Sequence, residues 1–349
     1  MRRYARSVEN HANERLPGKR SYASFFSSVA SFSLPAGAHV TPGAVRGYYI
    51  DMGIKAETPD WPPPGMPPTE LRMHVATIQW GLGAYERYLA GEGEAWLAAA
   101  LSCAEELLDE QQTSGALAGG WVHVRPFPHT FPLRPPWLSA MSQGEGASLM
   151  VRMHAETGEQ RYAEAARRAL LPLQLDSADG GVRATLAGRP FPEEYPTSPP
   201  SFVLNGGMFA IWGLHDVGVG LDEPQALADF EQAVDTLAAN LHRWDLGYWS
   251  RYDLFPHPVL NVASSFYHDL HIKQLRMTNL LAPRPELAEA AERWAAYTES
   301  SINRRRAFAA KALFRLVVPR SRALARRLPW SAIEGGEEAA LARKPRGAG

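Results

Sequence analysis

The feature that most constrains the fold of this chain is a fourfold repetition of helix, short turn and helix. In each repeat a helical run ends at Gly or Pro, and an acidic residue opens an Ala/Leu/Glu-rich helix. The turns lie around Gly91, Gly158, Asp222 and Pro285. Equivalent positions in the second helices are 66, 64 and 61 residues apart: Trp96, Tyr162, Ala226 and Leu287. This spacing predicts a mainly α protein in which about four helical hairpins stack and close into an (α/α) toroid; the alternative is an irregular helical domain.

Long connections between these hairpins hold most of the Pro, Gly and aromatic residues, over 119–137, 180–200 and 246–269. Each contains a short alternating stretch, WVHV, VRAT or YWSRYDL, that predicts a small β-hairpin. Connections of this length are uncommon in compact domains unless they are functional. In a toroid they gather at one end of the ring, so we expect the chemistry there.

The pattern divides the chain into three predicted parts. Residues 1–68 are predicted to form a β-containing arm or cap that ends in the proline-rich linker TPDWPPPGMPP, and residues 69–300 are predicted to form the catalytic toroid. Residues 301–349 carry 12 Lys+Arg against three Glu and predict a basic helical tail, partly disordered. This tail is expected to contact an acidic polymer, a membrane or a partner; the alternative is a solvated helix that ends the domain.

Composition excludes several classes of protein. Lys+Arg 36 against Asp+Glu 37 argues against a general nucleic-acid binder. The single cysteine, Cys103, excludes an internal disulfide framework and CxxC sites. The basic start is followed by no apolar signal region and no apolar run is long enough to span a membrane, so we expect a soluble, cytoplasmic protein. No GxGxxG or P-loop pattern is present, and no cofactor is expected.

The loop EEYPTSPPSFVLNG at 193–206 is the densest candidate site. Two carboxylates, Glu193 and Glu194, precede Tyr195, and the following prolines restrict the backbone that carries these side chains. Rigid placement of this kind suits catalytic groups. Asn205 lies before an apolar helix, where it serves either as a helix cap, the better reading of an isolated Asn, or as a functional residue.

Two further segments, SRYDL at 250–254 and FYHDLHIKQL at 266–275, complete the candidates. His268 and His271 are three residues apart, a spacing found in metal sites, but histidines bound to backbone or substrate are commoner and we expect no metal. Tyr195, Tyr252 and Tyr267 each lie in an inter-hairpin segment beside charged or histidine residues. This convergence favours a functional role over simple core packing.

Several of these runs resemble, in order and spacing, the C-terminal domain of the D-glucuronyl C5-epimerases, which act on heparosan and heparan sulfate precursors. The runs are IQWGLGAY (78–85), WLSAMSQGEGASLMVR (137–152), EEYPTSPPSFVLNG with GLHDV, YDL, and NVASSFYHDLHIKQL, within roughly 45–300. The resemblance implies an α/α-toroid catalytic domain and a homodimer. It also implies that these residues match active-site positions: Glu194, Tyr195, Asn205, Tyr252 and Tyr267.

The chain departs from this pattern in places. Phe255 follows YDL where the animal enzymes have an arginine, Ser264 or Ser265 stands where they carry a second arginine, and Phe209 replaces a tyrosine. The large N-terminal β domain of the animal proteins is missing or shortened. The reaction type therefore carries over better than the exact substrate.

The resemblance implies removal of the C5 hydrogen of a glucuronyl unit and return of a proton on the opposite face, which needs two opposed acid/base groups. We assign Tyr267 and Tyr195 as the opposed pair, with Glu194 acting through Tyr195, and Tyr252 as positioning or sharing the base role. His268 and Arg251 are the expected cationic neighbours of Tyr267 and Tyr252. The expected binding residues for an acidic polysaccharide are Asn205, His268, His271, Arg134, Arg251, Gln143 and Trp80.

Within that binding set, Asn205 with His271 or Arg134 is expected to support the uronate carboxylate as negative charge builds on it.

Two alternatives to an epimerase remain open. A uronate polysaccharide lyase on the same fold would form the same carbanion and expel the C4 oxygen. A non-catalytic glycan-binding protein would hold the sugar by aromatic stacking.

Overall fold

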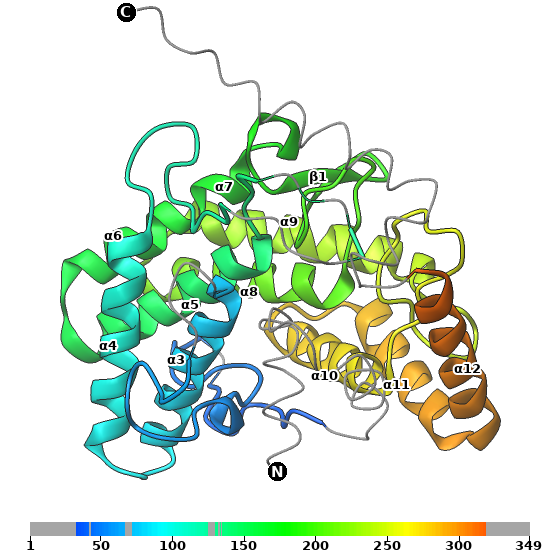
Figure 1. Ribbon diagram of the computed structural model, residues 1–349, viewed down its shortest axis with the longest axis horizontal. Helices are drawn as coiled ribbons and strands as arrows, with labels where there is room; N and C mark the ends of the chain where they lie inside the picture. Colours follow the sequence, from blue (N-terminus) through cyan, green and yellow to red (C-terminus); the bar gives the residue numbers. More distant parts are fainter. Residues whose placement is uncertain are drawn as a thin grey trace, which may run out of the picture.

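The computed structural model describes residues 33–41, 43–66, 72–124, 130–131, 133 and 135–318. Four antiparallel helical hairpins form its body (Figure 1), and each turn falls where the sequence predicts it. The hairpins are α3 (His74–Leu89) with α4 (Glu94–Glu110), α5 (Ala140–Thr157) with α6 (Gln160–Ala169), α8 (Leu204–Gly220) with α9 (Pro224–Asn240), and α10 (Ser265–Leu281) with α11 (Pro285–Glu299).

Local chemistry explains these boundaries. Gly158 ends α5 in the left-handed conformation, with φ of 73°, and its N–H donates to the His154 carbonyl. Pro224 and Pro285 open α9 and α11, where a missing N–H costs nothing because the first helical N–H has no intrahelical partner. Turn residues of this kind are encoded locally, which is why the hairpins can be read from the sequence.

The first helices of the hairpins form one layer and the second helices the other. Within the first layer α3 packs on α5, α5 on α8, and α8 on α10, while each partner helix covers its own hairpin. Helices α5 and α8 approach closely because a Cβ on Gly144 would overlap the backbone of Ala210. Every residue of α8 from Leu204 to Gly218 is buried. This two-layer succession of hairpins is the arrangement of an (α/α) toroid and confirms the predicted fold class.

The inter-hairpin connections differ in their β content. The 180–200 connection forms the predicted hairpin, β1 (Arg183–Leu186) paired antiparallel with β2 (Arg189–Pro192). It follows the short α7 (Leu171–Gln174) and η3 (Ser177–Asp179). The WVHV and YWSRYDL stretches form isolated antiparallel bridges instead, through His123 to Trp137, Asp245 to Ser250 and Arg251 to Val262. The partners of His123 and Arg251 lie too far along the chain for a tight turn.

The described part of the N-terminal arm is fastened to the helices rather than built as a β cap. Its strand pairing is limited to the bridges Ala36 to Ile50 and Thr41 to Ala44, with one 3-10 turn, η1 (Gly53–Lys55). The Arg152 guanidinium donates to the Gly47 carbonyl at 2.9 Å and pairs with Asp216 at 2.7 Å, both side chains being 1% exposed. This buried pair ties the arm to α5 and α8. The SYASFFSSVAS stretch lies outside the described residues.

Helix α12 (Ser301–Val317) follows α11 and lies beside it in Figure 1. It buries Ala307, Lys311 and Phe314 against α10, α11 and the loop before α10. The first part of the predicted tail therefore packs on the body, while residues 319–349 lie outside the described part.

Over the residues described, the structure has no helix with both the length and the apolar character that a membrane crossing requires.

Candidate active site

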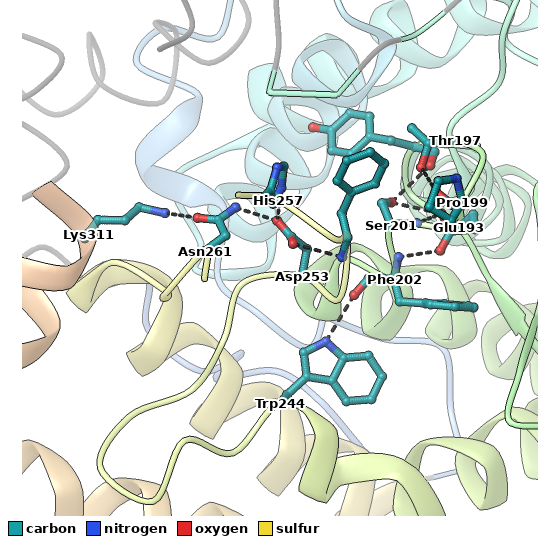
Figure 2. Close-up of polar contacts among 12 residues, drawn as sticks. Glu193, Thr197, Pro199, Ser201, Phe202, Trp244, Asp253, His257, Asn261 and Lys311 are labelled. Atoms are coloured by element: carbon teal, nitrogen blue, oxygen red, sulfur yellow. Dashed lines mark hydrogen bonds and ion pairs between the residues drawn. The ribbon is translucent and has the colours of Figure 1, made fainter. Parts of the chain in front are cut away.

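Glu193 shapes the loop that precedes α8. Its fully buried carboxylate accepts hydrogen bonds from the Ser201 N–H at 2.8 Å, the Ser201 hydroxyl at 2.9 Å and the Phe202 N–H at 2.6 Å (Figure 2). Burial raises the pKa of Glu193 to about 7, and these hydrogen bonds oppose the rise. One side chain thus closes the loop on itself and fixes the segment that carries Tyr195.

Glu194 lies against the first turn of α8. A Cβ on Gly206 would overlap its carboxyl group, so the glycine makes room for the acid. The residue is 5% exposed, and burial raises its pKa to about 8, although a hydrogen bond with Tyr195 opposes the shift. Its Oε2 has no hydrogen-bond partner among the described residues. At neutral pH Glu194 is therefore a protonated acid that can donate a hydrogen bond or a proton.

The three tyrosines singled out by the sequence come together. Tyr195 and Tyr252 belong to one apolar cluster, and Tyr267 packs against it. The rings of Tyr252 and Tyr267 meet edge to face with centroids 4.7 Å apart. The other buried members of the cluster are Met73, Phe131, Trp137 and Val203. Residues from two connections and from α10 thus place three phenols around one point of the toroid.

Asn205 is not the cap of α8. The N-cap is Val203, so Asn205 lies inside the first turn, and the capping reading is wrong. Gln274 of α10 donates from its Nε2 to the Asn205 carbonyl at 3.0 Å. Asn205 Oδ1 and Gln274 Oε1 are both buried and, within the part of the chain that is described, neither has a partner. Buried polar atoms normally have hydrogen-bond partners, so this pair points to a polar ligand or water between α8 and α10.

The histidine pair is neutral, and hydrogen bonds fix the tautomer of His268. The Ser250 N–H donates to His268 Nδ1 at 3.1 Å, so His268 carries its proton on Nε2, which donates to the Trp294 carbonyl at 3.0 Å. The Ser250 hydroxyl lies 2.8 Å from His268 Nδ1 and 2.9 Å from His271 Nδ1. His271 Nε2 is buried and, over the described residues, has no hydrogen-bond partner.

Burial corrects the predicted charge of both histidines. Burial lowers the pKa of His268 to about 4, and its ring stacks on Trp249 at 3.8 Å, so it is a neutral core residue rather than a cation beside Tyr267. Burial likewise lowers the pKa of His271 well below its usual value. A neutral imidazole offers a carboxylate no positive charge, so His271 suits a sugar hydroxyl better than the uronate carboxylate.

No group of three or more His, Cys, Asp or Glu side chains suited to hold a metal ion occurs among the described residues. The histidine pair itself is engaged with Ser250 and the Trp294 carbonyl.

Two of the remaining predicted residues, Gln143 and Trp80, serve the fold. Gln143 is fully buried and uses its amide to donate to the Gly119 and Ala169 carbonyls and to accept from the Trp121 N–H. Trp80 is a core residue with its ring 4.6 Å from Trp61. Arg251 is half-buried, and its pKa is lowered by burial against the pull of Asp253. Arg134 lies outside the described residues.

Sequence reasoning missed a buried acid on α5. Glu145 is fully buried, and Gln79 Nε2 donates to both of its carboxylate oxygens, at 2.8 and 3.0 Å. Lys55 donates to the Oε1 of the same Gln79. Burial raises the pKa of Glu145, the hydrogen bonds from Gln79 and the charge of Lys55 oppose the rise, and ionisation of Glu194 would raise it further. Glu145 thus lies within electrostatic reach of Glu194. Its position inside the run SQGEGAS was the available signal.

The site as a whole brings together groups that can transfer protons and bind a polar ring. It combines phenols, a protonated carboxyl group at Glu194, and buried polar atoms of Asn205, Gln274 and His271 that have no partner among the described residues. Acid/base groups need pKa values matched to their task, and burial supplies the shift here.

Comparison with known proteins agrees with this geometry. A profile of the D-glucuronyl C5-epimerase C-terminus matches residues 118–296. A D-glucuronyl C5-epimerase of Caenorhabditis elegans is 33% identical over 181 residues, which cover 47% of this chain and 29% of that protein. An uncharacterized protein of Methanocaldococcus jannaschii is 26% identical over 160 residues, which cover 44% of this chain and 50% of that protein. The chain thus spans half or less of the length of these relatives.

A solved structure of a UGL variant with dGlcA-Glc-Rha-Glc is similar at a TM-score of 0.42 and 15% identity, over 64% of this chain and 61% of that chain. The profile match begins before α5, ends within α11, and includes Glu194 and the three tyrosines. Because it also covers just over half of the 349 residues, the chain belongs to the D-glucuronyl C5-epimerase family through the C-terminal domain of that family.

Proposed function

We propose that this protein epimerises D-glucuronyl to L-iduronyl units at C5 within an acidic polysaccharide of the heparosan type. The observation that carries the proposal is the meeting of Tyr195, Tyr252 and Tyr267 beside the protonated acid Glu194. Three separate segments supply these four residues, and all of them lie within the matched range 118–296.

In the proposed reaction a tyrosinate removes the C5 hydrogen as a proton, and the electron pair of the broken C–H bond moves into the adjacent carboxylate. A phenol on the opposite face then returns a proton to C5, which inverts the centre. One proton leaves and one arrives, so no redox partner is needed. Exchange with solvent resets the two phenols. General acid/base steps of this kind contribute typically about 10²–10⁴-fold in rate.

We assign the base side to Tyr267 and Tyr252, whose rings are in contact, and the opposite side to Tyr195 with Glu194 behind it. Glu194 serves as the reservoir that reprotonates Tyr195, since burial keeps its proton on at neutral pH. Asn205 and Gln274 bind polar groups of the sugar, and His271 Nε2 binds a sugar hydroxyl. Arg134 keeps its proposed place as a carboxylate partner.

The test is incubation of the purified protein with glucuronyl polymers in deuterated water, read by NMR. Epimerisation predicts deuterium at C5 together with iduronyl signals, and a polymer whose carboxyl groups have been reduced to alcohols serves as the inactive control. A lyase would give an unsaturated product that absorbs in the ultraviolet, and a glycan-binding protein would bind without exchange. Either of those outcomes would replace the proposed function.

A further inference from the structure

We propose that Lys311 of α12 is a positioning residue that holds a positive charge beside Tyr252 and so favours its tyrosinate form. The inference rests on the proposed function, because it assigns Lys311 to the base side of that site. Lys311 lies beyond residues 118–296 and beyond the toroid predicted from the sequence.

Lys311 is buried in contact with the tyrosine cluster. It is 8% exposed, and its Nζ lies 5.3 Å from the centroid of the Tyr252 ring. The neighbouring basic residues of the helix, Arg304, Arg305 and Arg306, are exposed. Burying a lysine is costly unless its charge is compensated or used. The burial of Lys311 therefore needs an explanation, whereas the exposure of the three arginines does not.

A hydrogen-bonded chain holds the ammonium group in place (Figure 2). Lys311 Nζ donates to Asn261 Oδ1 at 2.8 Å, and Asn261 Nδ2 donates to Asp253. The Asn261 carbonyl accepts from the Tyr252 N–H at 2.8 Å. Asn261 therefore binds the lysine through its side chain and the tyrosine through its backbone. This shared partner sets the position of Nζ relative to the Tyr252 ring.

His268, adjacent to Tyr267, does not provide this charge, because it is neutral and bound to Ser250 and Trp294. Arg251, the residue before Tyr252, is half-buried, and burial lowers its pKa. A positive charge close to a phenol favours its ionised form, so Lys311 would assist the step in which Tyr252 takes or shares the C5 proton.

Other titratable groups surround Lys311 and Tyr252, and their effects can be separated from the effect of Lys311. Asp253 and His257 belong to the loop, Tyr267 and His271 to α10, and Arg315 to α12. Asp253 is fully buried and accepts from the Phe255 N–H at 3.1 Å, with His257 Nε2 at 3.3 Å. Burial lowers the pKa of His271 and keeps that histidine neutral, and the charge of Lys311 adds to the lowering. A comparison of the parent with Tyr252→Phe therefore identifies the ionisation that belongs to the Tyr252 phenol.

The experiment compares Lys311→Gln, which keeps a donor for Asn261 but removes the charge, with Lys311→Arg, which keeps the charge. Arg305→Gln, an exposed change on the same helix, is the matched control. We expect Lys311→Gln to lower kcat for C5 deuterium exchange about tenfold or more, the effect of roughly one pKa unit in the base, with KM little changed. Lys311→Arg should recover part of the loss, and Arg305→Gln should match the parent.

A second readout does not depend on activity. Tyrosinate absorbance is titrated in the parent, in Tyr252→Phe and in Lys311→Gln, and the phenol missing from Tyr252→Phe should ionise at higher pH once the lysine is neutralised. An unchanged kcat or an unchanged titration in folded Lys311→Gln overturns the proposal. If the parent shows no exchange on any glucuronyl polymer, the proposed function fails, while the titration still decides whether Lys311 acts on Tyr252. Should Lys311→Gln not fold, Asn261→Ala provides the same titration test by releasing Nζ.

Discussion

Glu194 gives the sharpest test of the site, because its burial affects both stability and catalysis. The residue is 5% exposed and its pKa is raised from 4.5 to about 8, chiefly by burial. The folded protein therefore binds a proton at Glu194 that the unfolded chain releases between these two pH values. Glu194→Gln replaces this acid by a neutral group of the same shape.

The sign and size of the change in the free energy of unfolding follow from proton linkage. A carboxyl group whose pKa is raised on folding lowers the free energy of unfolding as pH rises, by about 1.4 kcal/mol per pH unit between the unfolded and folded pKa values. From about pH 5 to about pH 8 this amounts to roughly 3 to 4 kcal/mol. Glu194→Gln removes the penalty, so its stability relative to the parent should rise by about that amount over this range.

The assay is chemical denaturation of both proteins at several pH values, with Glu164→Gln as control because Glu164 is 64% exposed. The control should show no such pH-dependent gain. The same Glu194→Gln protein should lose C5 exchange by about 10²-fold, since it cannot pass a proton to Tyr195. If the stability difference between Glu194→Gln and the parent does not change with pH, Glu194 is ionised in the folded protein. The proposed role of Glu194 as the proton reservoir for Tyr195 would then be refuted.

Three other predictions follow from the same contacts. Tyr267→Phe should keep its ring contact with Tyr252 and lose about 10²–10⁴-fold in turnover. Tyr297→Phe, which removes a hydroxyl bonded to Asp245, should not lose turnover. Near-normal turnover of Tyr267→Phe would make Tyr267 a core aromatic. Gly206→Ala should cost about 1–3 kcal/mol in denaturation and reduce activity, because its Cβ overlaps Glu194. Deleting the chain after Arg304 should lower the melting temperature, since α12 buries Phe314; an unchanged melting temperature would mean that α12 adds no stability.

The fold was largely predictable because its signals are local. Gly158 adopts the left-handed conformation that ends a helix, and Pro285 opens the next hairpin where its missing N–H does no harm. Such residues specify a turn whatever surrounds them. The β content of the connections depends on distant partners instead. His123 pairs with Trp137, and Arg251 with Val262, so alternation within WVHV or YWSRYDL could not reveal isolated bridges.

The site was predictable in its residue types and less so in their electrostatics. Family resemblance singled out Tyr195, Tyr252 and Tyr267, and the fold gathers them. The charge of His268 could not be inferred from its neighbours in sequence, because its neutrality comes from Trp294 and Ser250, which other segments supply. Lys311 gave no signal at all. From the sequence alone, a lysine on a basic helix is expected to be exposed to solvent. Only the packing of the helix shows which of its turns faces the tyrosines.

Carboxylates organise the connections that carry the proposed chemistry. Glu193 accepts from the Ser201 and Phe202 N–H groups, Asp253 from the Phe255 N–H, and Asp245 from the Gly247 N–H. Each acid folds a Pro- or Gly-rich segment around itself, and charge-assisted bonds to backbone N–H groups are stronger than neutral ones. Two of these segments present Tyr195 and Tyr252. Loops without regular β structure can therefore hold phenols as firmly as strands would, and a change at Glu193 or Asp253 should act on catalysis through the position of the neighbouring tyrosine.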